Sequence, residues 1–384
     1  MMGRARVQRR STRRQFITRA GTLAASLAAG AAVWPNFNRR AEGAPSLKGT
    51  GEVVVYDGGG AWGHAVEEAY FKPFQQATGI KVVPNVEQAP AAKIKAGILA
   101  GVPGYDVTDI TGGDLQQFID GNLLLPIDYS YWDPADVAAF KPVPTNKYHV
   151  CALFFSLVIA YDPKKFGSSP PKTWADFWDT KKFPGQRSLG PGDWASGSGT
   201  WEVALMADGV PPNHLYPLDL DRALRALTRL KPSIAKFWQS GAEGPQLLND
   251  GEVSMTTAWN GRVSDLRAQG GNIADTWNQG LLQWDSWAVP KGAKNVENAM
   301  KFIAFASQPG PQAKFAELIA YGPPNSRAYQ SLSKERIAVL PTAPAIRELQ
   351  VVQNYTWWNS KAPNGKTYCE NVVGLWQKWV TGTK

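Results

Sequence analysis

Residues 51–127 alternate short strand-like runs with helical segments, and the helical segments end close to glycines. This alternation is typical of an α/β domain whose sheet is mainly parallel, because helices then connect successive strands. The expected elements, strands and helices in turn, are Glu52–Tyr56, Trp62–Ala77, Ile80–Val86, Pro90–Ala100, Tyr105–Ile110 and Asp114–Ile119. The pattern therefore predicts an α/β fold for this part of the chain.

Two later apolar segments extend this prediction. Cys151–Tyr161 is a long apolar run, and its length favours a buried extended strand or crossover. Leu281–Val289 is a second apolar segment, which follows the strand-like run Val253–Ala258. We therefore predict two α/β lobes that are joined by crossover strands, with a ligand cleft between the lobes.

The remaining signals set the expected boundaries. Thr173 and Asp176 are spaced as a capping box at a helix start, and leucines within Asp219–Lys231 repeat on one helical face that we expect to pack in a core. We expect the first lobe to comprise residues 50–153 and 288–345 and the second lobe residues 157–283. A C-terminal helical segment, residues 346–384, is expected to pack on the lobes.

The formal charge of +9 does not indicate a nucleic-acid-binding surface. Of the 41 basic and 32 acidic side chains, nine arginines and one glutamate lie within residues 1–44, which leaves 32 basic and 31 acidic side chains in the rest of the chain. Binding to a phosphate backbone needs a concentrated basic face. We therefore expect no nucleic-acid partner.

The basic N-terminus has the pattern of an export signal. Arg13 and Arg14 form a twin-arginine motif in Thr12–Ile17, and an apolar stretch of Ala, Leu and Gly follows at about residues 21–33. That stretch is too short for a dedicated membrane-spanning helix, which takes about 20 residues. We predict that residues 1–44 are a signal peptide, that cleavage falls near Ala41–Ala44, and that the mature protein is periplasmic and does not span a membrane.

The chain offers few residues for metal binding or nucleophilic catalysis. His64, His149 and His214 lie far apart and lack metal-ligand spacing. Cys151 and Cys369 are the two cysteines, and the sequence leaves open whether they pair. No paired carboxylates or Ser–His–Asp frame stand out, so we expect no catalytic residue, no metal and no cofactor.

One motif keeps an enzymatic alternative open. Residues Gly58–Gly63 satisfy G-x-G-x-x-G, follow a strand and open a helix, as in dinucleotide-binding folds. Trp62 and Pro84 argue against this interpretation, since the first is bulky and the second removes an N–H from the next strand. The alternative function is an exported NAD(P)-dependent oxidoreductase that uses this loop.

Tryptophans beside acidic or polar residues recur where strands or loops end. The chain has 16 tryptophans, and three such pairs are Trp201-Glu202, Trp259-Asn260 and Trp284-Asp285. Strand ends face the ligand crevice in open α/β sheets. Aromatic faces attract an organic ammonium ion, and carboxylates accept its hydrogen bonds. This pattern favours a binding site for a small amine.

Five motifs in order resemble the spermidine/putrescine-binding periplasmic proteins of ATP-driven importers. The motifs are Thr-Gly-Ile-Lys-Val at 78–82, Thr-Trp-Ala-Asp-Phe-Trp-Asp at 173–179, Trp-Asn-Gly at 259–261, the run from Trp284 to Asn295, and Tyr-Gly-Pro-Pro-Asn at 321–325. The resemblance covers about residues 51–360. It implies a two-lobed periplasmic-binding-protein fold of type II, and a monomer that captures an amine and docks on the membrane permease of an ABC transporter.

The resemblance also implies the residues of the pocket. The implied ligand-binding residues within the motifs are Trp259, Asp285 and Tyr321. The resemblance adds Glu202, in the Glu-Val pair after the glycine-rich loop, and Thr111, after the third strand. The resemblance implies that the carboxylates neutralise ammonium groups and that the aromatic rings enclose the methylene chain.

Departures from the family pattern widen the range of expected ligands. Asp57 stands at the first-lobe wall without the family's neighbouring indole, which we expect Trp62 to supply. Gln283 replaces an aromatic residue, with Trp284 one position away, and Asp193 is the candidate for a second carboxylate near the glycine-rich loop. The predicted ligand is therefore putrescine, spermidine or a related amino compound such as 4-aminobutyrate. The orientation of Arg262 bears on this choice, because an amino-acid carboxylate needs such a partner.

Overall fold

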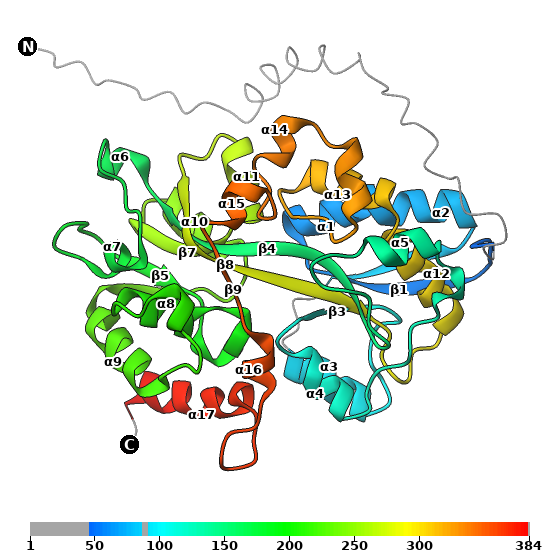
Figure 1. Cartoon of the computed structure of the whole chain (residues 1–384), viewed down its shortest axis with the longest axis horizontal. Coiled ribbons are helices and arrows are strands. Elements are labelled where there is room, and N and C mark those ends of the chain that lie inside the picture. The colour runs from blue at the N-terminus through cyan, green and yellow to red at the C-terminus, as the bar shows by residue number, and fades with distance from the viewer. Residues whose placement is uncertain (1–45, 87–90, 383–384) are drawn as a thin grey trace, which may run out of the picture. The chain divides into compact units, whose positions relative to one another are not determined.

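The computed structural model describes residues 46–86 and 91–382, so the predicted signal peptide and position 90 lie outside the described residues. β1 (Glu52–Asp57) and β2 (Lys81–Val86) form a parallel pair. A larger mixed sheet has the strand order β3-β8-β4-β7-β5-β6, with β9 beside β8 (Figure 1). Its strands are β3 (Thr108–Thr111), β4 (Val150–Tyr161), β5 (Arg187–Leu189), β6 (Ile234–Phe237), β7 (Met255–Trp259), β8 (Ala274–Ala288) and β9 (Val351–Val352).

The helices lie on both sides of these strands. In the first half of the chain they are α1 (Gly60–Val66), α2 (Lys72–Thr78), α3 (Ala91–Leu99), α4 (Leu115–Asp120), α5 (Pro134–Ala139), α6 (Pro163–Phe166) and α7 (Trp174–Trp178). They continue with α8 (Thr200–Ala207), α9 (Leu220–Leu230), α10 (Glu243–Asn249), α11 (Asn260–Ala268), α12 (Val296–Ala306) and α13 (Pro309–Leu318). The last are α14 (Lys334–Ile337), α15 (Pro344–Arg347), α16 (Tyr355–Asn359) and α17 (Tyr368–Thr381).

The two predicted crossover segments are strands that run side by side. β4 covers the apolar run almost exactly as expected, and β8 begins seven residues before Leu281. They pair antiparallel along most of their length, from Val150 opposite Trp287 to Tyr161 opposite Ala274 (Figure 1). Nearly every β4 side chain is buried, which explains the continuous apolar sequence.

Both strands contribute to two separate hydrophobic clusters. The first cluster contains Leu153 and Phe155 of β4 with Val53 and Val55 of β1 and Phe302 of α12. The second contains Leu157 and Ile159 of β4 and Leu281 of β8, with tryptophans and leucines of α7, α8, α9 and α17. The long strands therefore tie one core to the other. The residue boundaries that we predict for the lobes stay a prediction.

The expectation of a mainly parallel sheet is only partly met. Val107 bridges Val55 in parallel, as predicted for a third strand. The four residues that follow, Thr108–Thr111, pair antiparallel with β8 instead. The reason is that β8 returns along the edge of the first core and inserts between β3 and β4.

Local signals in the sequence are mostly confirmed. The side chain of Thr173 accepts a hydrogen bond from the backbone of Asp176, and the Asp176 carboxylate accepts one from Thr173 N, which completes the capping box. The single helix expected over Trp62–Ala77 contains a π-helical turn at Glu67–Phe71 between α1 and α2. Pro84 is tolerated because β2 lies at the edge of its pair.

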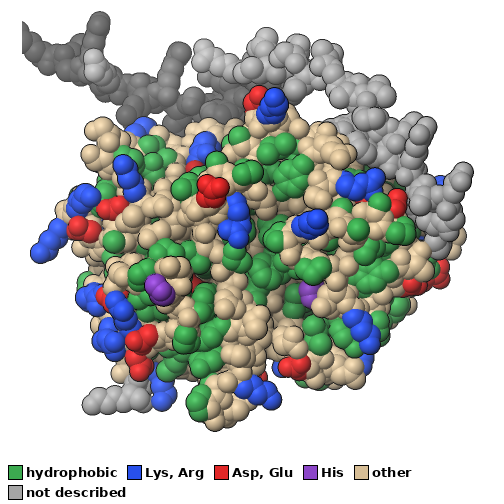
Figure 2. Space-filling model, in the orientation of Figure 1, with side chains coloured by type: hydrophobic (Ala, Val, Ile, Leu, Met, Phe, Trp, Pro, Cys, Tyr) green, Lys and Arg blue, Asp and Glu red, His purple; other side chains and the backbone are tan. Residues whose placement is uncertain are grey.

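Charged side chains of both signs are interspersed over the face shown in Figure 2. Among the described residues, no helix combines the length and hydropathy that a membrane span requires.

Asp106 joins the first strand to the segment that returns after β8. Its side chain is 2 % exposed, and it accepts hydrogen bonds from Val54 N at 2.8 Å, Lys294 N at 2.8 Å and Asn295 N at 2.9 Å. The Asn295 side chain donates a fourth at 2.9 Å. Backbone donors from two distant parts of the chain thus depend on one carboxylate.

Replacing Asp106 by Ala should lower the free energy of unfolding by about 3 kcal/mol or more, because each buried donor left without an acceptor costs about 1–3 kcal/mol. Asp106→Asn keeps one acceptor oxygen and should lose less. Urea unfolding of both variants measures the difference. Equal stability of Asp106→Ala and the wild type would contradict this role.

Candidate functional site

A cavity of about 350 Å³ lies where β1, β3, β4, β7 and β8 approach one another. This volume is at the lower end of the range for small-molecule sites, about 300–1,000 Å³. Acidic and aromatic side chains dominate its walls, with one arginine. They are Tyr56, Trp62, Asp109, Thr111, Asp114, Phe155, Asp193, Trp194, Trp259, Arg262, Asp285, Tyr321 and Glu370, and the wall is completed by smaller residues.

Asp109 and Asp285 come from neighbouring antiparallel strands. Thr111 of β3 pairs with Asp285 of β8, and Asp109 pairs with Trp287, so the two carboxylates are diagonal neighbours. Side chains at diagonal positions of an antiparallel pair lie on the same face, about 7–8 Å apart at the backbone. Oδ1 of each carboxylate is buried and has no hydrogen-bond partner among the described residues.

Burial makes the charged form of these carboxylates unfavourable. It raises the pKa of Asp285 to about 7; a hydrogen bond from Thr111 opposes the rise, and the charge of Asp114 adds to it. Burial raises the pKa of Asp114 to about 6. Burial, with the charge of Asp285, also raises the pKa of Asp109 well above its usual range. A cation in the cavity would favour ionisation of all three groups.

Arg262 reaches the cavity from the first turn of α11. Its side chain is 7 % exposed, Nη1 donates to the Gly59 carbonyl at 3.3 Å, and Nε has no partner among the described residues. A guanidinium with free donors fits a carboxylate. The cavity therefore holds a cluster of acids and one buried base.

The Trp-Asn-Gly motif makes the turn that brings Arg262 there. Asn260 accepts a hydrogen bond from Ser156 N at 2.9 Å and donates one to the Ala320 carbonyl at 2.5 Å. A Cβ at Gly261 would overlap the ring of Tyr321, so the close approach of that ring needs glycine. The motif thus fixes Tyr321 and Trp259 on one wall, where both rings contact Phe155 at centroid distances of 6.0 and 5.8 Å.

The cavity brings together five of the eight residues that the sequence analysis assigns to ligand binding. These five are Trp62, Thr111, Trp259, Asp285 and Tyr321. Asp193, the candidate second carboxylate, and Arg262 also line it.

Three of the eight lie elsewhere. Asp57 accepts a hydrogen bond from Gly59 N at 2.7 Å and so holds the glycine loop. Trp284 precedes Asp285 in β8, and successive strand residues face opposite sides, so its ring packs on Tyr355 at 4.2 Å instead. Glu202 is fully buried in α8 and is bonded to Tyr216, Gln353 and Trp358.

The sequence-based set lacks three acidic lining residues, Asp109, Asp114 and Glu370, and three aromatic ones, Tyr56, Phe155 and Trp194. Asp109 could have been found, because it is two residues before Thr111 and strand alternation puts both on one face. Tyr56 ends the predicted first strand. Nothing in the sequence pattern relates Glu370, near the C-terminus, to residues 109 or 285.

The family follows from comparison with known proteins. A model of the family described as bacterial extracellular solute-binding protein matches residues 69–345. The chain belongs to this family. Members related to it include the gamma-aminobutyric acid-binding protein of Pseudomonas aeruginosa, which is 39% identical over 298 residues, 76% of this chain and 82% of that protein. The spermidine/putrescine-binding periplasmic protein of Escherichia coli is 28% identical over 324 residues, 80% of this chain and 88% of that protein.

Solved structures agree with the family assignment. An ABC transporter substrate-binding protein from Bradyrhizobium japonicum matches with a TM-score of 0.76 and 38% identity, over 86% of this chain and 99% of that chain. The solute-binding protein described here therefore has the two-lobed periplasmic-binding-protein fold, and it is the substrate-binding component of an ABC transporter, not an enzyme. Such components bind small solutes and interact with a membrane permease.

The oxidoreductase alternative finds no support in these comparisons. The Gly58–Gly63 loop has a different structural use, since Gly58 and Trp62 line the cavity. Gly59 and Gly60 have φ values of 65° and 55°, which favour glycine. A Cβ at Gly63 would overlap the Asp57 carboxylate. The glycines thus allow a tight turn at the cavity wall.

Binding of a small ammonium compound should weaken as the pH falls from 8 to 5.5. Protons compete with the cation for Asp285, whose pKa burial raises to about 7, so the affinity should fall about 30-fold through this group alone. Calorimetric titration with 4-aminobutyrate and putrescine, in buffers of different ionisation enthalpy, measures both the affinity and the released proton. Asp285→Asn should remove this contribution, and any pH dependence that remains should come from Asp109 and Asp114. An affinity of the wild type that is constant over this range would contradict the role of Asp285.

Proposed function

We propose that this protein captures a short amino acid with a terminal ammonium group, such as 4-aminobutyrate, and delivers it to the membrane permease of an ABC importer. The observation that carries the proposal is the buried Arg262 in the same cavity as Asp109, Asp114 and Asp285. A solute with one positive and one negative end satisfies both groups. The similarity to a gamma-aminobutyric acid-binding protein supports the same class of solute.

The proposed binding mode follows from the charges. The ammonium group lies against Asp285 and Asp109, whose free Oδ1 atoms accept its hydrogen bonds. The methylene chain lies between Trp259 and Tyr321. The carboxylate accepts hydrogen bonds from Arg262.

A diamine fits the same cavity less well. Its second ammonium group would meet Arg262, and like charges in a buried site are unfavourable. Glu202, the carboxylate that the family resemblance assigns to a polyamine, is turned away from the cavity and satisfied by other side chains. These observations favour 4-aminobutyrate over putrescine.

4-Aminobutyrate and putrescine are a matched pair of probes, because both have a four-carbon chain and they differ at one end. Calorimetry should show that the wild type binds 4-aminobutyrate at least 100-fold more tightly. Arg262→Met should weaken 4-aminobutyrate binding by about 100-fold, since loss of one partner of a buried charged pair costs about 2–5 kcal/mol. It should leave putrescine binding unchanged or improve it. A wild type that prefers putrescine, or an Arg262→Met variant that binds 4-aminobutyrate normally, would overturn the proposal.

We further infer that the lobes comprise residues 50–153 with 288–345, and residues 157–283, with residues 346–384 packed on both. The two hydrophobic clusters and the two strands shared between them support this division. The cavity lies where the clusters meet, so a movement of the lobes would open it. We infer that the protein acts as a monomer.

We also infer that the protein reaches the periplasm by the twin-arginine route and that residues 1–44 are then removed. The family assignment and the motif around Arg13 and Arg14 support this inference. Replacing both arginines by lysine keeps the charge and should abolish export, whereas lysine at Arg9 and Arg10 should not. Fractionation and mass measurement of the exported protein test it. Normal export of the Arg13/Arg14 variant would contradict the route.

A further inference from the structure

The C-terminal segment, residues 351–382, forms part of the cavity wall. Cys369, Glu370 and Val373 of α17 line the cavity. The backbone of this segment first runs parallel to β8, where Val351 and Val352 pair with Leu281 and Leu282. It then forms α16 and α17, which lie beside α8 and close to α3 and α4 in Figure 1.

The same segment contacts the loop that carries the acidic cluster. A Cβ at Gly112 would overlap the ring of Tyr355, and one at Gly113 would overlap Ser196 and crowd the same ring, so these glycines allow the loop before Asp114 to pack closely on Tyr355. Cys369 Sγ lies 3.7 Å from the Gly113 carbonyl. The Tyr355 hydroxyl accepts a hydrogen bond from Trp284 N at 3.4 Å, next to Asp285. The position of the C-terminal segment therefore affects both Asp114 and Asp285.

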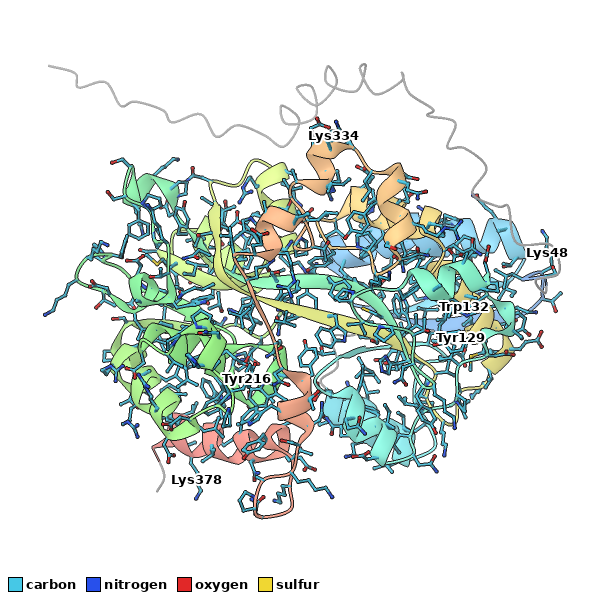
Figure 3. All side chains as sticks on the ribbon, in the orientation of Figure 1. Lys48, Tyr129, Trp132, Tyr216, Lys334 and Lys378 are labelled. Atoms are coloured by element: carbon cyan, nitrogen blue, oxygen red, sulfur yellow. The ribbon has the colours of Figure 1, made fainter. Side chains whose placement is uncertain are left out.

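One buried carboxylate holds this segment. Oε1 of Glu202 accepts hydrogen bonds from Trp358 Nε1 at 2.7 Å and Gln353 Nε2 at 2.9 Å, both in the C-terminal segment. It also accepts one from the Tyr216 hydroxyl at 2.7 Å, and that hydroxyl accepts one from Asn354 N at 3.1 Å. Figure 3 shows Tyr216 beside the chain that leads into α16. We name these four residues, Glu202, Tyr216, Gln353 and Trp358, the Glu202 clasp.

The clasp continues to β8 through Gln283. Gln283 Nε2 donates to Gln353 Oε1 at 2.9 Å and to the Ser196 carbonyl at 2.8 Å. Gln283, which stands where the resemblance implies an aromatic residue, therefore links β8 to the C-terminal segment by hydrogen bonds. Oε2 of Glu202 and Oε1 of Gln283 are buried acceptors without a partner among the described residues.

We propose that Glu202 is a positioning residue, which clasps the C-terminal segment to the second core and so completes the wall of the solute-binding cavity. This role differs from the ligand contact that the family resemblance implies for Glu202. Burial raises the pKa of Glu202, which favours its neutral form. Glutamine is the neutral mimic of that form, and so it should replace Glu202 in the clasp. The proposal does not depend on which solute binds.

The two cysteines provide a built-in readout. Both are buried free thiols: Cys369 lies in the C-terminal segment, and Cys151 lies in β4. Release of the segment alone exposes Cys369, whereas general unfolding exposes both. The ratio of their modification rates by a small thiol reagent, followed by peptide mass spectrometry, therefore separates a positioning role from a loss of overall stability.

Glu202→Leu should raise the modification rate of Cys369 at least tenfold without changing that of Cys151, and it should weaken 4-aminobutyrate binding at least tenfold. Glu202→Gln should keep both values within about twofold of the wild type. Trp358→Phe removes one donor of the clasp and keeps the ring, so it provides a milder variant if Glu202→Leu does not fold. Its matched control is Trp379→Phe, which also removes one indole donor from the C-terminal segment: Trp379 Nε1 donates to Thr228 Oγ1 at 2.9 Å, and its ring packs on Phe237 and Trp376, outside the clasp.

If Glu202→Leu raised the modification rates of both cysteines equally, or did not raise that of Cys369, the proposed clasp would be wrong. If the modification rate of Cys369 rose while the affinity for the solute stayed unchanged, the proposed effect of the clasp on the cavity would be wrong. Failure of the proposed function gives another result: the wild type would bind no 4-aminobutyrate. The modification rate of Cys369 would still rise in Glu202→Leu and stay unchanged in Glu202→Gln.

Discussion

The antiparallel pairing of β4 with β8 is the interaction on which the rest of the structure depends. Each strand contributes side chains to both hydrophobic clusters, so the backbone hydrogen bonds of one ladder hold both cores together. The same ladder places β8 next to β3, and this contact brings Asp285 close to Asp109 and Thr111. The cavity and its charge are thus consequences of how the chain returns from the second core to the first.

The walls of the cavity bring buried charged and polar groups together. Three carboxylates with raised pKa values line the same cavity as one buried guanidinium, and the polar atoms Asp109 Oδ1, Asp285 Oδ1 and Arg262 Nε have no partners among the described residues. Buried polar groups are normally satisfied, and unsatisfied ones are costly. A bound zwitterion supplies a donor to the acids and an acceptor to the arginine. Both charge and hydrogen bonding therefore support the proposed zwitterionic solute.

Much of the fold could be predicted from the sequence because its signals are local. The apolar run of β4, the capping box at Thr173 and Asp176 and the alternation over residues 51–127 each report on neighbouring residues. The antiparallel insertion of β8 beside β3 could not be predicted, because it depends on pairing between segments about 175 residues apart.

The candidate site, like the fold, could be predicted only in part from the sequence. Trp259 and Tyr321 occupy motifs, and the Trp-Asn-Gly turn explains why they meet. The family resemblance also assigns Glu202 to the ligand, but its side chain accepts hydrogen bonds from Gln353 and Trp358, which come from a segment that the motifs do not cover. A residue type in a motif indicates a chemistry, and the surrounding contacts decide whether that chemistry serves a ligand or the fold.

The most direct test of the central claim is a crystal structure of the mature chain with 4-aminobutyrate. The account predicts the ammonium nitrogen about 3 Å from the Asp285 carboxylate and the solute carboxylate about 3 Å from the Arg262 guanidinium, with the methylene chain between Trp259 and Tyr321. A solute bound outside this cavity, or one whose carboxylate makes no contact with Arg262, would contradict it.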